Sequence, residues 1–401
     1  MNQIERVSYW LILLFPAVII SVKILGPLIY LILALIGISI WIVRKSSPFS
    51  IKELQLFSWL TVGYFMVMAL SVALSTEPTN EWSHLSRKIQ FLLAPLVGLV
   101  LYYIRVPIEK MLTALKLGVI IAGGIVWIEW LIGGYGSRLS GMFNPNTFGD
   151  IVVVMLWMSL INADKESEKA YRYTIVGMVL GTSAVVMSGS RASILVYMIL
   201  LLLYSVLMYK NKALNVKVYR MLLVGVLTFG AVVYLNGAIM NRATLAVSEV
   251  AAWEEGEDNI SSVGVRLEMY RTGLRAFKDS PLIGYGYRNA NSVASRYADD
   301  STRKKIACYT HLHNEYLTNM VSAGIVGLMM LLVLFFMPLR YFIGMTRKKE
   351  SRASRAGILL VVGFMLNGIL HAALQWEYQN SFFPFFLGYF FIMSGEKKNE
   401  Q

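Results

Sequence analysis

The segment His311-Leu-His-Asn-Glu-Tyr-Leu-Thr-Asn-Met-Val-Ser-Ala-Gly-Ile-Val-Gly327 leads into an apolar run that continues to about residue 343. It holds two of the four histidines of the chain, His311 and His313, followed by Asn314 and Glu315. Titratable side chains at the end of a membrane helix are costly unless they pair or have a function. The segment therefore predicts a membrane helix with a functional site at its start.

The rest of the chain has the same apolar character. Hydrophobic residues make up 56% of its 401 residues, and apolar runs of about 18 or more residues are long enough to cross a bilayer. Only helices and closed barrels span lipid, and these runs are too continuous for barrel strands of about ten alternating residues. We therefore predict an all-α polytopic membrane protein, a single integral membrane domain over residues 1–401. About twelve spans are predicted, at residues 7–22, 25–43, 55–75, 89–104, 113–132, 148–163, 173–189, 192–208, 220–238, 315–343, 356–375 and 381–394.

Basic loops predict the orientation of these spans, because Lys and Arg collect on the cytoplasmic side. The basic loops that fall on one side lie at residues 44–52, 105–110, 210–220, 347–355 and 397–398. We expect that side to be cytoplasmic, with both termini there. The topology accounts for much of the net charge of +13, so we expect no nucleic-acid partner.

One large loop, residues 239–312, falls on the opposite side between the ninth and tenth spans. It begins with an acidic run at 254–258. Residues 263–277 have the periodicity of an amphipathic helix, for which Ser262 is the candidate N-cap. Pro281-Leu-Ile-Gly284-Tyr-Gly286 predicts a turn after it. The loop is also rich in cations, among them Arg266 and Arg271.

Arg191 follows a turn of small residues, Ser188-Gly-Ser190, between two spans on the same outer side. A lone arginine there is commonly a snorkelling side chain that marks the membrane edge. Beside exposed backbone amides and the Ser190 hydroxyl, however, a guanidinium predicts an anion site. Arg266 is a candidate second cation over the same cavity, with Arg271 as a possible supporting residue.

His313 is the best candidate for proton transfer, because the unperturbed pKa of histidine lies near neutrality. Asn314 and Glu315 can orient it, and His311 competes for the same role. Asn144-Pro-Asn146 predicts a turn on the outer side, whose asparagines are candidate supporting residues.

Two further sets of residues bear on the site. His371, Gln375 and Glu377 either line the same cavity or form hydrogen bonds between helices. The chain has no P-loop, HExxH, C-x-x-C or Asp-x-Asp motif. We therefore predict no cofactor and no metal.

In combination, these motifs resemble a known family. His313-Asn314, nine residues and then Gly324-Ile-Val-Gly327 is similar to the His-Asn-x9-Gly-x-x-Gly signature of bacterial O-antigen ligases. The serine turn before Arg191, Phe143-Asn-Pro-Asn146 and the 281–286 segment resemble elements of the wider superfamily of O-antigen ligases and polymerases. The chain departs from the ligases at their Arg-x3-Leu element, because Tyr270 follows Arg266 at that offset.

The resemblance implies glycosyl transfer at the periplasmic face of the Gram-negative inner membrane. The donor would be O-antigen on undecaprenyl diphosphate, and the acceptor a sugar hydroxyl of lipid A–core oligosaccharide, both held among membrane lipids. His313 would be the general base, and Arg191 and Arg266 would hold the diphosphate. The displacement would be metal-independent, because arginines can stabilise the departing diphosphate without a divalent ion. It would be inverting, because we find no carboxylate pair suited to a covalent intermediate.

Three alternatives remain at this stage. An O-antigen polymerase would use the same kind of donor with a second lipid-linked glycan as acceptor, and a protein O-oligosaccharyltransferase would use a protein. A polysaccharide or lipid transporter is the alternative from another class. Transporters bind substrate near the bilayer midplane between internal repeats, whereas this chain concentrates polar residues at one face.

Overall fold

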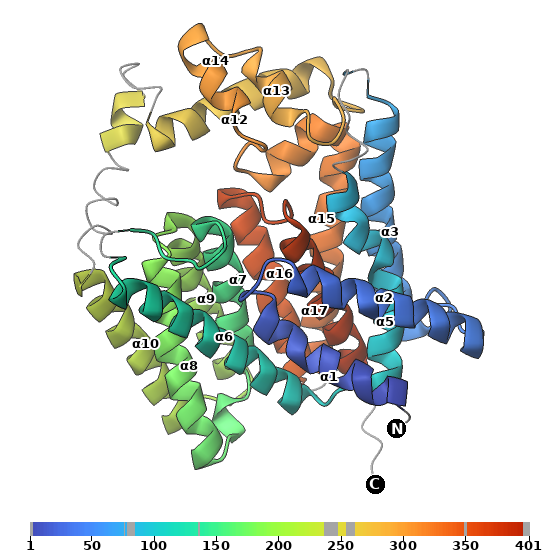
Figure 1. The fold of residues 1–401 in the computed structure, drawn as a ribbon, viewed down its shortest axis with the longest axis vertical. Helices are drawn as coiled ribbons and strands as arrows, with labels where there is room; N and C mark the ends of the chain where they lie inside the picture. The colour runs from blue at the N-terminus through green and yellow to red at the C-terminus, as the bar shows by residue number, and fades with distance from the viewer. Residues whose placement is uncertain are drawn as a thin grey trace.

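The structure, a computed structural model, describes residues 3–75, 77, 85–134, 137–235, 248–253, 261–348 and 351–395. Throughout this part of the chain every regular element is a helix (Figure 1). The bundle is formed by α1 (Gln3–Val18), α2 (Leu25–Arg44), α3 (Lys52–Ala73), α5 (Ile89–Ile104), α6 (Ile108–Leu131), α7 (Pro145–Ser159), α8 (Glu168–Met187), α9 (Arg191–Lys210), α10 (Val216–Leu235), α15 (Glu315–Lys348), α16 (Arg352–Leu370) and α17 (Glu377–Gly395).

Ten of these helices have the length and hydropathy to cross a membrane, judged over the described residues. The exceptions are α1 and α17. Large apolar side chains point away from the bundle, such as Ile42 and Leu131, which are 70% and 66% exposed. Apolar surface of this extent belongs in lipid rather than in water. The prediction of an all-α polytopic membrane protein is therefore confirmed.

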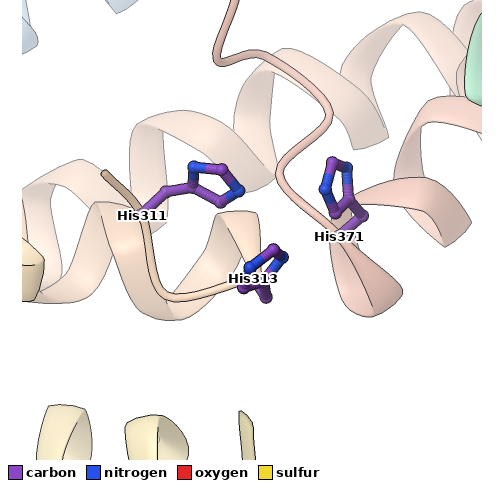
Figure 2. A group of neighbouring side chains, drawn as sticks. All are labelled: His311, His313 and His371. Atoms are coloured by element: carbon purple, nitrogen blue, oxygen red, sulfur yellow. The ribbon is translucent and has the colours of Figure 1, made fainter. Parts of the chain in front are cut away.

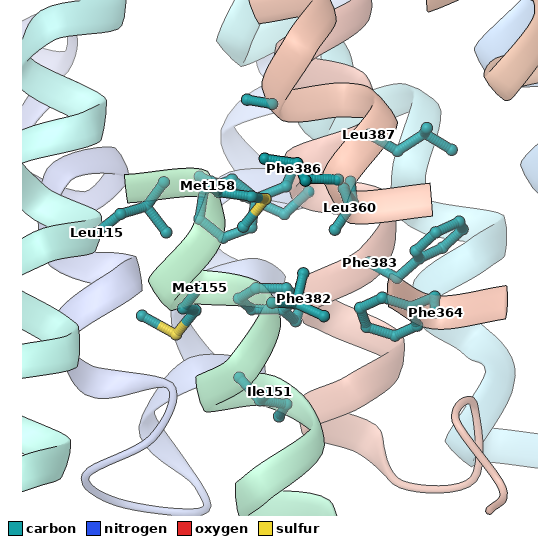
Figure 3. Packing of buried hydrophobic residues seen from close by; sticks show 14 of the residues in the cluster. Leu115, Ile151, Met155, Met158, Leu360, Phe364, Phe382, Phe383, Phe386 and Leu387 are labelled. Carbon is teal, nitrogen blue, oxygen red and sulfur yellow. The ribbon is translucent and has the colours of Figure 1, made fainter. Parts of the chain in front are cut away.

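Helix α7 lies at the centre of one half of the bundle. Every residue from Thr147 to Ser159 is buried, because α7 packs against α6, α8, α9 and α16. Figure 3 shows Ile151, Met155 and Met158 of α7 among aromatic and aliphatic side chains of α16 and α17. Any polar residue between Thr147 and Ser159 is thus removed from both lipid and water and needs a partner inside the protein.

The large loop forms a cap on one end of the bundle (Figure 1). In its described residues the cap contains α12 (Ser262–Asp279), α13 (Ala290–Ser295) and α14 (Asp300–Ala307), and residues 248–253 are also helical. It has its own apolar core, which includes Val265, Met269 and Leu312 and extends onto Leu317 and Val321 of α15. The acidic run at 254–258 lies outside the described residues.

Helix α12 confirms the predicted amphipathic helix, but Ser262 is not its cap. The Ser261 hydroxyl accepts a hydrogen bond from the Gly264 amide at 3.0 Å, and Ser262 is the first helical residue. The two serines are adjacent, so the sequence pattern did not distinguish them.

Gly324 of the 313–327 motif marks a break in α15. Ala323 and Gly324 have non-helical angles, and φ at Gly324 is 63°. A Cβ on Gly324 would lie 2.2 Å from the Leu282 carbonyl oxygen, so only glycine fits. The 281–286 turn is seated in this break by hydrogen bonds from the amides of Tyr285, Gly286 and Ile325 to the carbonyls of Val321, Ser322 and Pro281, respectively. Two motifs far apart in sequence are thus parts of one joint.

The predicted boundaries differ from the observed ones by several residues at some helix ends, in both directions. Helix α16 begins at Arg352 rather than 356, after Ser351 caps it, and ends at Leu370 rather than 375. Helix α17 begins at Glu377 rather than 381. Hydropathy locates the lipid-compatible part of a helix, whereas caps and turns set its ends.

The start of α1 and the end of α17 lie at the end of the bundle opposite the cap (Figure 1).

Candidate functional site

Three histidines meet beneath the cap. His311 and His313 lie on the segment before α15, and His371 directly follows α16 (Figure 2). The ring centroids of His311 and His313 are 4.5 Å apart, and His371 lies 5.4 Å from the first and 5.2 Å from the second. All three side chains are buried. We call these residues the histidine cluster; His84 lies outside the described residues.

His313 is held in an uncommon backbone conformation. Its φ of 51° is in the left-handed region, which non-glycine residues rarely adopt. The Tyr270 hydroxyl donates a hydrogen bond to the His313 carbonyl oxygen at 3.1 Å, and the Tyr309 ring contacts the imidazole edge-on. A strained residue that its surroundings hold in place is typical of functional sites.

His371 is connected to α7 through Asp150. The Nδ1 atom of His371 lies 3.1 Å from Asp150 Oδ2, and Ser193 donates to Asp150 Oδ1 at 3.0 Å. The Ser193 hydroxyl is in turn 2.9 Å from that of Ser190. A line of polar contacts thus runs from the start of α9 through α7 to the histidine cluster.

A cavity of about 300 Å³ opens beside His371. It brings together the two arginines predicted to bind diphosphate, Arg191 and Arg266, although they lie 75 residues apart in sequence (266 − 191). We call it the arginine cavity. Its lining residues are Arg138, Asn146, Gly189, Arg191, Ala192, Ser262, Arg266, Leu370 and His371.

The cations of this cavity are held by the polypeptide around them. Arg138 Nε donates to the Ser188 carbonyl oxygen at 3.0 Å, and its terminal nitrogen donates to Asn146 Oδ1. Arg191 forms an ion pair of 3.7 Å with Glu249. Three guanidinium groups therefore face one small cavity, an arrangement suited to an anion with several negative oxygens.

The electrostatics keep two of the three imidazoles uncharged. Burial lowers the pKa of His311 well below its usual value, and the nearby charges of His371, Arg288 and Arg266 lower it further. Burial likewise lowers the pKa of His313, followed by the effects of His311, His371 and Arg266. Both are neutral at pH 7, the form that a general base requires.

Asn314 has a structural role in the cluster. Its Oδ1 accepts from the Leu317 amide at the start of α15, and its Nδ2 donates to the Ile369 carbonyl oxygen. It thereby supports the position of His313 but does not contact its ring. The Glu315 carboxylate, which we expected to orient His313, instead lies 3.8 Å from Lys88 Nζ and accepts from the Leu374 amide.

Three other predicted supporting residues lie outside the arginine cavity. Ser190 caps α9 and is buried. Asn144 caps α7 and lines a separate apolar cavity of about 650 Å³. Arg271 is paired with Glu268 at 2.6 Å and with Asp299 at 3.6 Å. Of the Asn144–Asn146 turn, only Asn146 lines the arginine cavity.

Two residues of the site were missed in the sequence. Asp150 is the acidic residue of an otherwise apolar predicted span, 148–163, and an ionisable residue within a membrane helix is itself a functional signal. Arg138 lies in an outer loop, where nothing in the sequence distinguishes it from a solvated arginine. The pairing of Leu139 with Met187 through their backbones brings it to the cavity.

Three imidazoles can in principle hold a metal ion, and ligand atoms of this cluster lie within 4.8 Å of one another. The surrounding charge argues against a dication. Arg266 and Arg288 are close enough to lower the histidine pKa values, and Asp150 is the one carboxylate in contact with the cluster among the described residues. A cationic environment favours an anion instead.

Comparisons with known proteins agree with the resemblance found in the sequence. Residues 176–332 match the family described as O-antigen ligase. An uncharacterized protein of Haemophilus influenzae is 23% identical over 325 residues, 78% of this chain and 79% of that protein. The O-antigen ligase of Escherichia coli K12 is 26% identical over 156 residues, 37% of this chain and 36% of that protein. The resemblance to the superfamily of O-antigen ligases and polymerases is confirmed.

Proposed function

We propose that this protein is an O-antigen ligase, an enzyme that transfers polysaccharide from undecaprenyl diphosphate to a sugar hydroxyl of lipid A–core. The observation that supports it best is the arginine cavity, in which Arg191 and Arg266 lie beside a cluster of buried histidines. A lipid diphosphate is an activated donor whose departing group gains negative charge. Preorganised guanidinium groups stabilise such charge in the transition state.

The location of the site fits membrane-anchored substrates. The cavity is lined by residues of α12 in the cap and by residues at the ends of α7, α9 and α16 in the bundle, and the cap lies on one end of the bundle (Figure 1). The distribution of basic loops supports a periplasmic location for the cap side and a cytoplasmic location for both termini. Both lipid-linked substrates would then meet the enzyme at the outer surface of the inner membrane.

The proposed mechanism is a single in-line displacement. The acceptor hydroxyl oxygen attacks the anomeric carbon while His313 takes the hydroxyl proton. The bond from the anomeric carbon to the phosphate oxygen breaks, and its electron pair stays on the diphosphate, held by Arg191 and Arg266. The anomeric configuration inverts. No metal ion takes part in this scheme.

The direct test is transfer by purified protein supplied with lipid-linked polymer and lipid A–core, with and without a chelator. We expect ligation in both. A strict requirement for a divalent ion would contradict the arginine-based mechanism.

An O-antigen polymerase is the second candidate, because the family resemblance includes both enzymes. A deletion strain distinguishes them. Loss of a ligase leaves long polymer on undecaprenyl diphosphate, whereas loss of a polymerase leaves single repeat units attached to the core. The spacing from His313 to Gly324 favours the ligase.

A further inference from the structure

A second cavity, of about 650 Å³, has no part in the displacement described above. We call it the apolar groove. Aliphatic side chains such as Leu28 and Leu31 of α2 and Leu93 of α5 line it. Leu28 and Leu31 are 43% and 45% exposed at the surface of the bundle. On α2 the lining runs from Ile24 to Leu31, two turns or about 10 Å of helix, so the groove is long enough for part of a hydrocarbon chain.

The groove lies at the same end of the bundle as the arginine cavity. The Tyr30 hydroxyl, in the second turn of α2, donates a hydrogen bond to the Gln90 carbonyl oxygen in the first turn of α5 at 2.9 Å. The start of α5 is at the cap end, because Lys88, the residue before it, lies 3.8 Å from the Glu315 carboxylate at the start of α15. The groove is therefore at the depth where the histidine cluster lies.

Two short segments line both cavities. Asn144 lines the apolar groove and Asn146 lines the arginine cavity, on the one turn that begins α7. His371 lines the arginine cavity, and Trp376, five residues later, lines the groove. A chain spans at most about 3.6 Å per residue, so Asn144 and Asn146 are no more than about 7 Å apart along the backbone. The two cavities are neighbours with the 144–146 turn as a common wall.

The end of the groove nearest the helix starts is polar. The Arg87 guanidinium pairs with Glu377 at 3.1 Å and lies over the Trp376 ring at 4.9 Å. Lys23 is an exposed cation on the same rim. Gln90 is only 7% exposed, and its side-chain oxygen has no hydrogen-bond partner in the described part of the chain. A buried acceptor in this state is costly unless a bound molecule donates to it.

An apolar groove with two cations and one carboxylate at its end matches an amphiphile with an anionic head group. Both substrates of the proposed reaction are of this kind, and the geometry of the displacement separates them. In-line attack places the acceptor hydroxyl and the departing diphosphate on opposite sides of the anomeric carbon. The diphosphate is assigned to the arginine cavity, so the acceptor approaches from another side. The apolar groove is the adjoining cavity, beyond the 144–146 turn.

We propose that the apolar groove is the binding site of the acceptor glycolipid, lipid A–core. An acyl chain of lipid A lies in the aliphatic part of the groove, and a lipid A phosphate lies at Lys23 and Arg87. The Gln90 side-chain oxygen accepts a hydrogen bond from a hydroxyl or amide group of the same molecule. This inference rests on the proposed function. It places donor and acceptor in separate cavities that meet at the histidine cluster.

The experiment measures binding of purified lipid A–core, and separately of undecaprenyl diphosphate without glycan, to the full-length protein in nanodiscs. Leu28→Trp puts a larger side chain into the groove and should weaken binding of lipid A–core by about 10-fold or more, as overfilling of a packed site does. Binding of undecaprenyl diphosphate should be unchanged. Leu202→Trp is the matched control, because Leu202 is 66% exposed on α9 and does not line the groove. It should bind both lipids as wild type does.

Lys23→Glu tests the assignment of the head group. It should weaken binding of lipid A–core by about 2- to 5-fold, the range for an exposed ion pair. Lipid A–core from which the phosphates have been removed should bind equally well to Lys23→Glu and to wild type. Lys210→Glu is the control, since Lys210 is exposed in the last turn of α9, and it should have no effect on either form.

Gln90→Leu separates binding from folding. The side-chain oxygen of Gln90 makes no hydrogen bond within the described chain, so its loss should leave the thermal midpoint equal or higher. Binding of lipid A–core should nevertheless fall by about 2- to 10-fold, as for loss of one neutral hydrogen bond. A residue with only a structural role would show the reverse, a lower midpoint and unchanged binding. If Leu28→Trp does not fold, Gln90→Leu and Lys23→Glu decide the question.

Two results would overturn the proposal. One is a wild-type affinity for lipid A–core in the groove variants. The other is weaker binding of undecaprenyl diphosphate in Leu28→Trp with unchanged binding of lipid A–core, which would assign the groove to the isoprenoid chain of the donor. The ligase proposal fails separately. If the groove variants lose lipid A–core as expected but the wild-type protein never transfers polymer to it, the groove remains a glycolipid site and the assigned reaction is wrong.

Discussion

The Asn314 side-chain amide donates a hydrogen bond to the carbonyl oxygen of Ile369 at 3.0 Å. This contact joins the segment that carries His311 and His313 to the end of the helix that precedes His371. The same amide group caps α15 through its oxygen. One asparagine thus fixes two parts of the histidine cluster relative to each other, which gives a physical reason for the His-Asn pair in the sequence.

Asn314→Asp should separate these two functions. A carboxylate still accepts from the Leu317 amide but cannot donate to Ile369. We expect the thermal midpoint to stay close to wild type and transfer to fall. Asn314→Ala loses the cap as well, which costs about 1 kcal/mol. Wild-type transfer rates in Asn314→Asp would show that the Ile369 contact does not position the cluster.

His313→Ala should lower transfer by about 10²- to 10⁴-fold, the usual contribution of a general base. The measurement is ligation in membranes at matched protein abundance. A rate within a few-fold of wild type would remove His313 from this role.

Arg191→Lys and Arg266→Lys should each impair transfer, because an ammonium cannot reproduce the two parallel hydrogen bonds of a guanidinium to phosphate oxygens. Arg303→Lys is the control, since Arg303 pairs with the exposed Asp300 outside the cavity. A wild-type rate of transfer in Arg191→Lys would indicate that Arg191 only marks the membrane edge.

Gly324→Ala should destabilise the protein by about 1–3 kcal/mol, because the residue has a left-handed backbone and its new Cβ would overlap the Leu282 carbonyl. Gly344→Ala lies on the same helix with open space around the added methyl group and should have no such effect. Equal thermal midpoints for the two variants would exclude a structural need for the break.

Stability should fall as pH drops from 7 to 5. Burial lowers the pKa of His311 and His313 in the folded protein, whereas the unfolded chain binds protons near the usual value of about 6.5. As pH falls, the unfolded chain therefore binds protons at these histidines before the folded protein does. The free energy of unfolding is thus highest above the usual histidine pKa of about 6.5 and decreases below it. The thermal midpoint measured across this range should fall less in His311→Gln than in wild type.

Much of the fold could be predicted from sequence because lipid imposes a simple rule on composition and length. Apolar runs located the helices, but not the break at Gly324, since glycine within such a run is compatible with a continuous helix. His313, Arg191 and Arg266 were identified from local patterns. His371 was named as a residue that could line the same cavity, and it does. Arg138 and Asp150 were not identified, because their places in the site depend on contacts between α7, α8 and α16 that no local spacing encodes.

The seating of the 281–286 turn in the broken α15 has a mechanical consequence. At this point three backbone hydrogen bonds join the cap to the bundle. Gly284 and Gly324 lie so close to the opposite backbone that neither has room for a methyl group. Opening of the cap at this point would have to break these three hydrogen bonds. If the proposed function is right, a long lipid-linked glycan would reach the site from the side, with its polymer outside the space between cap and bundle.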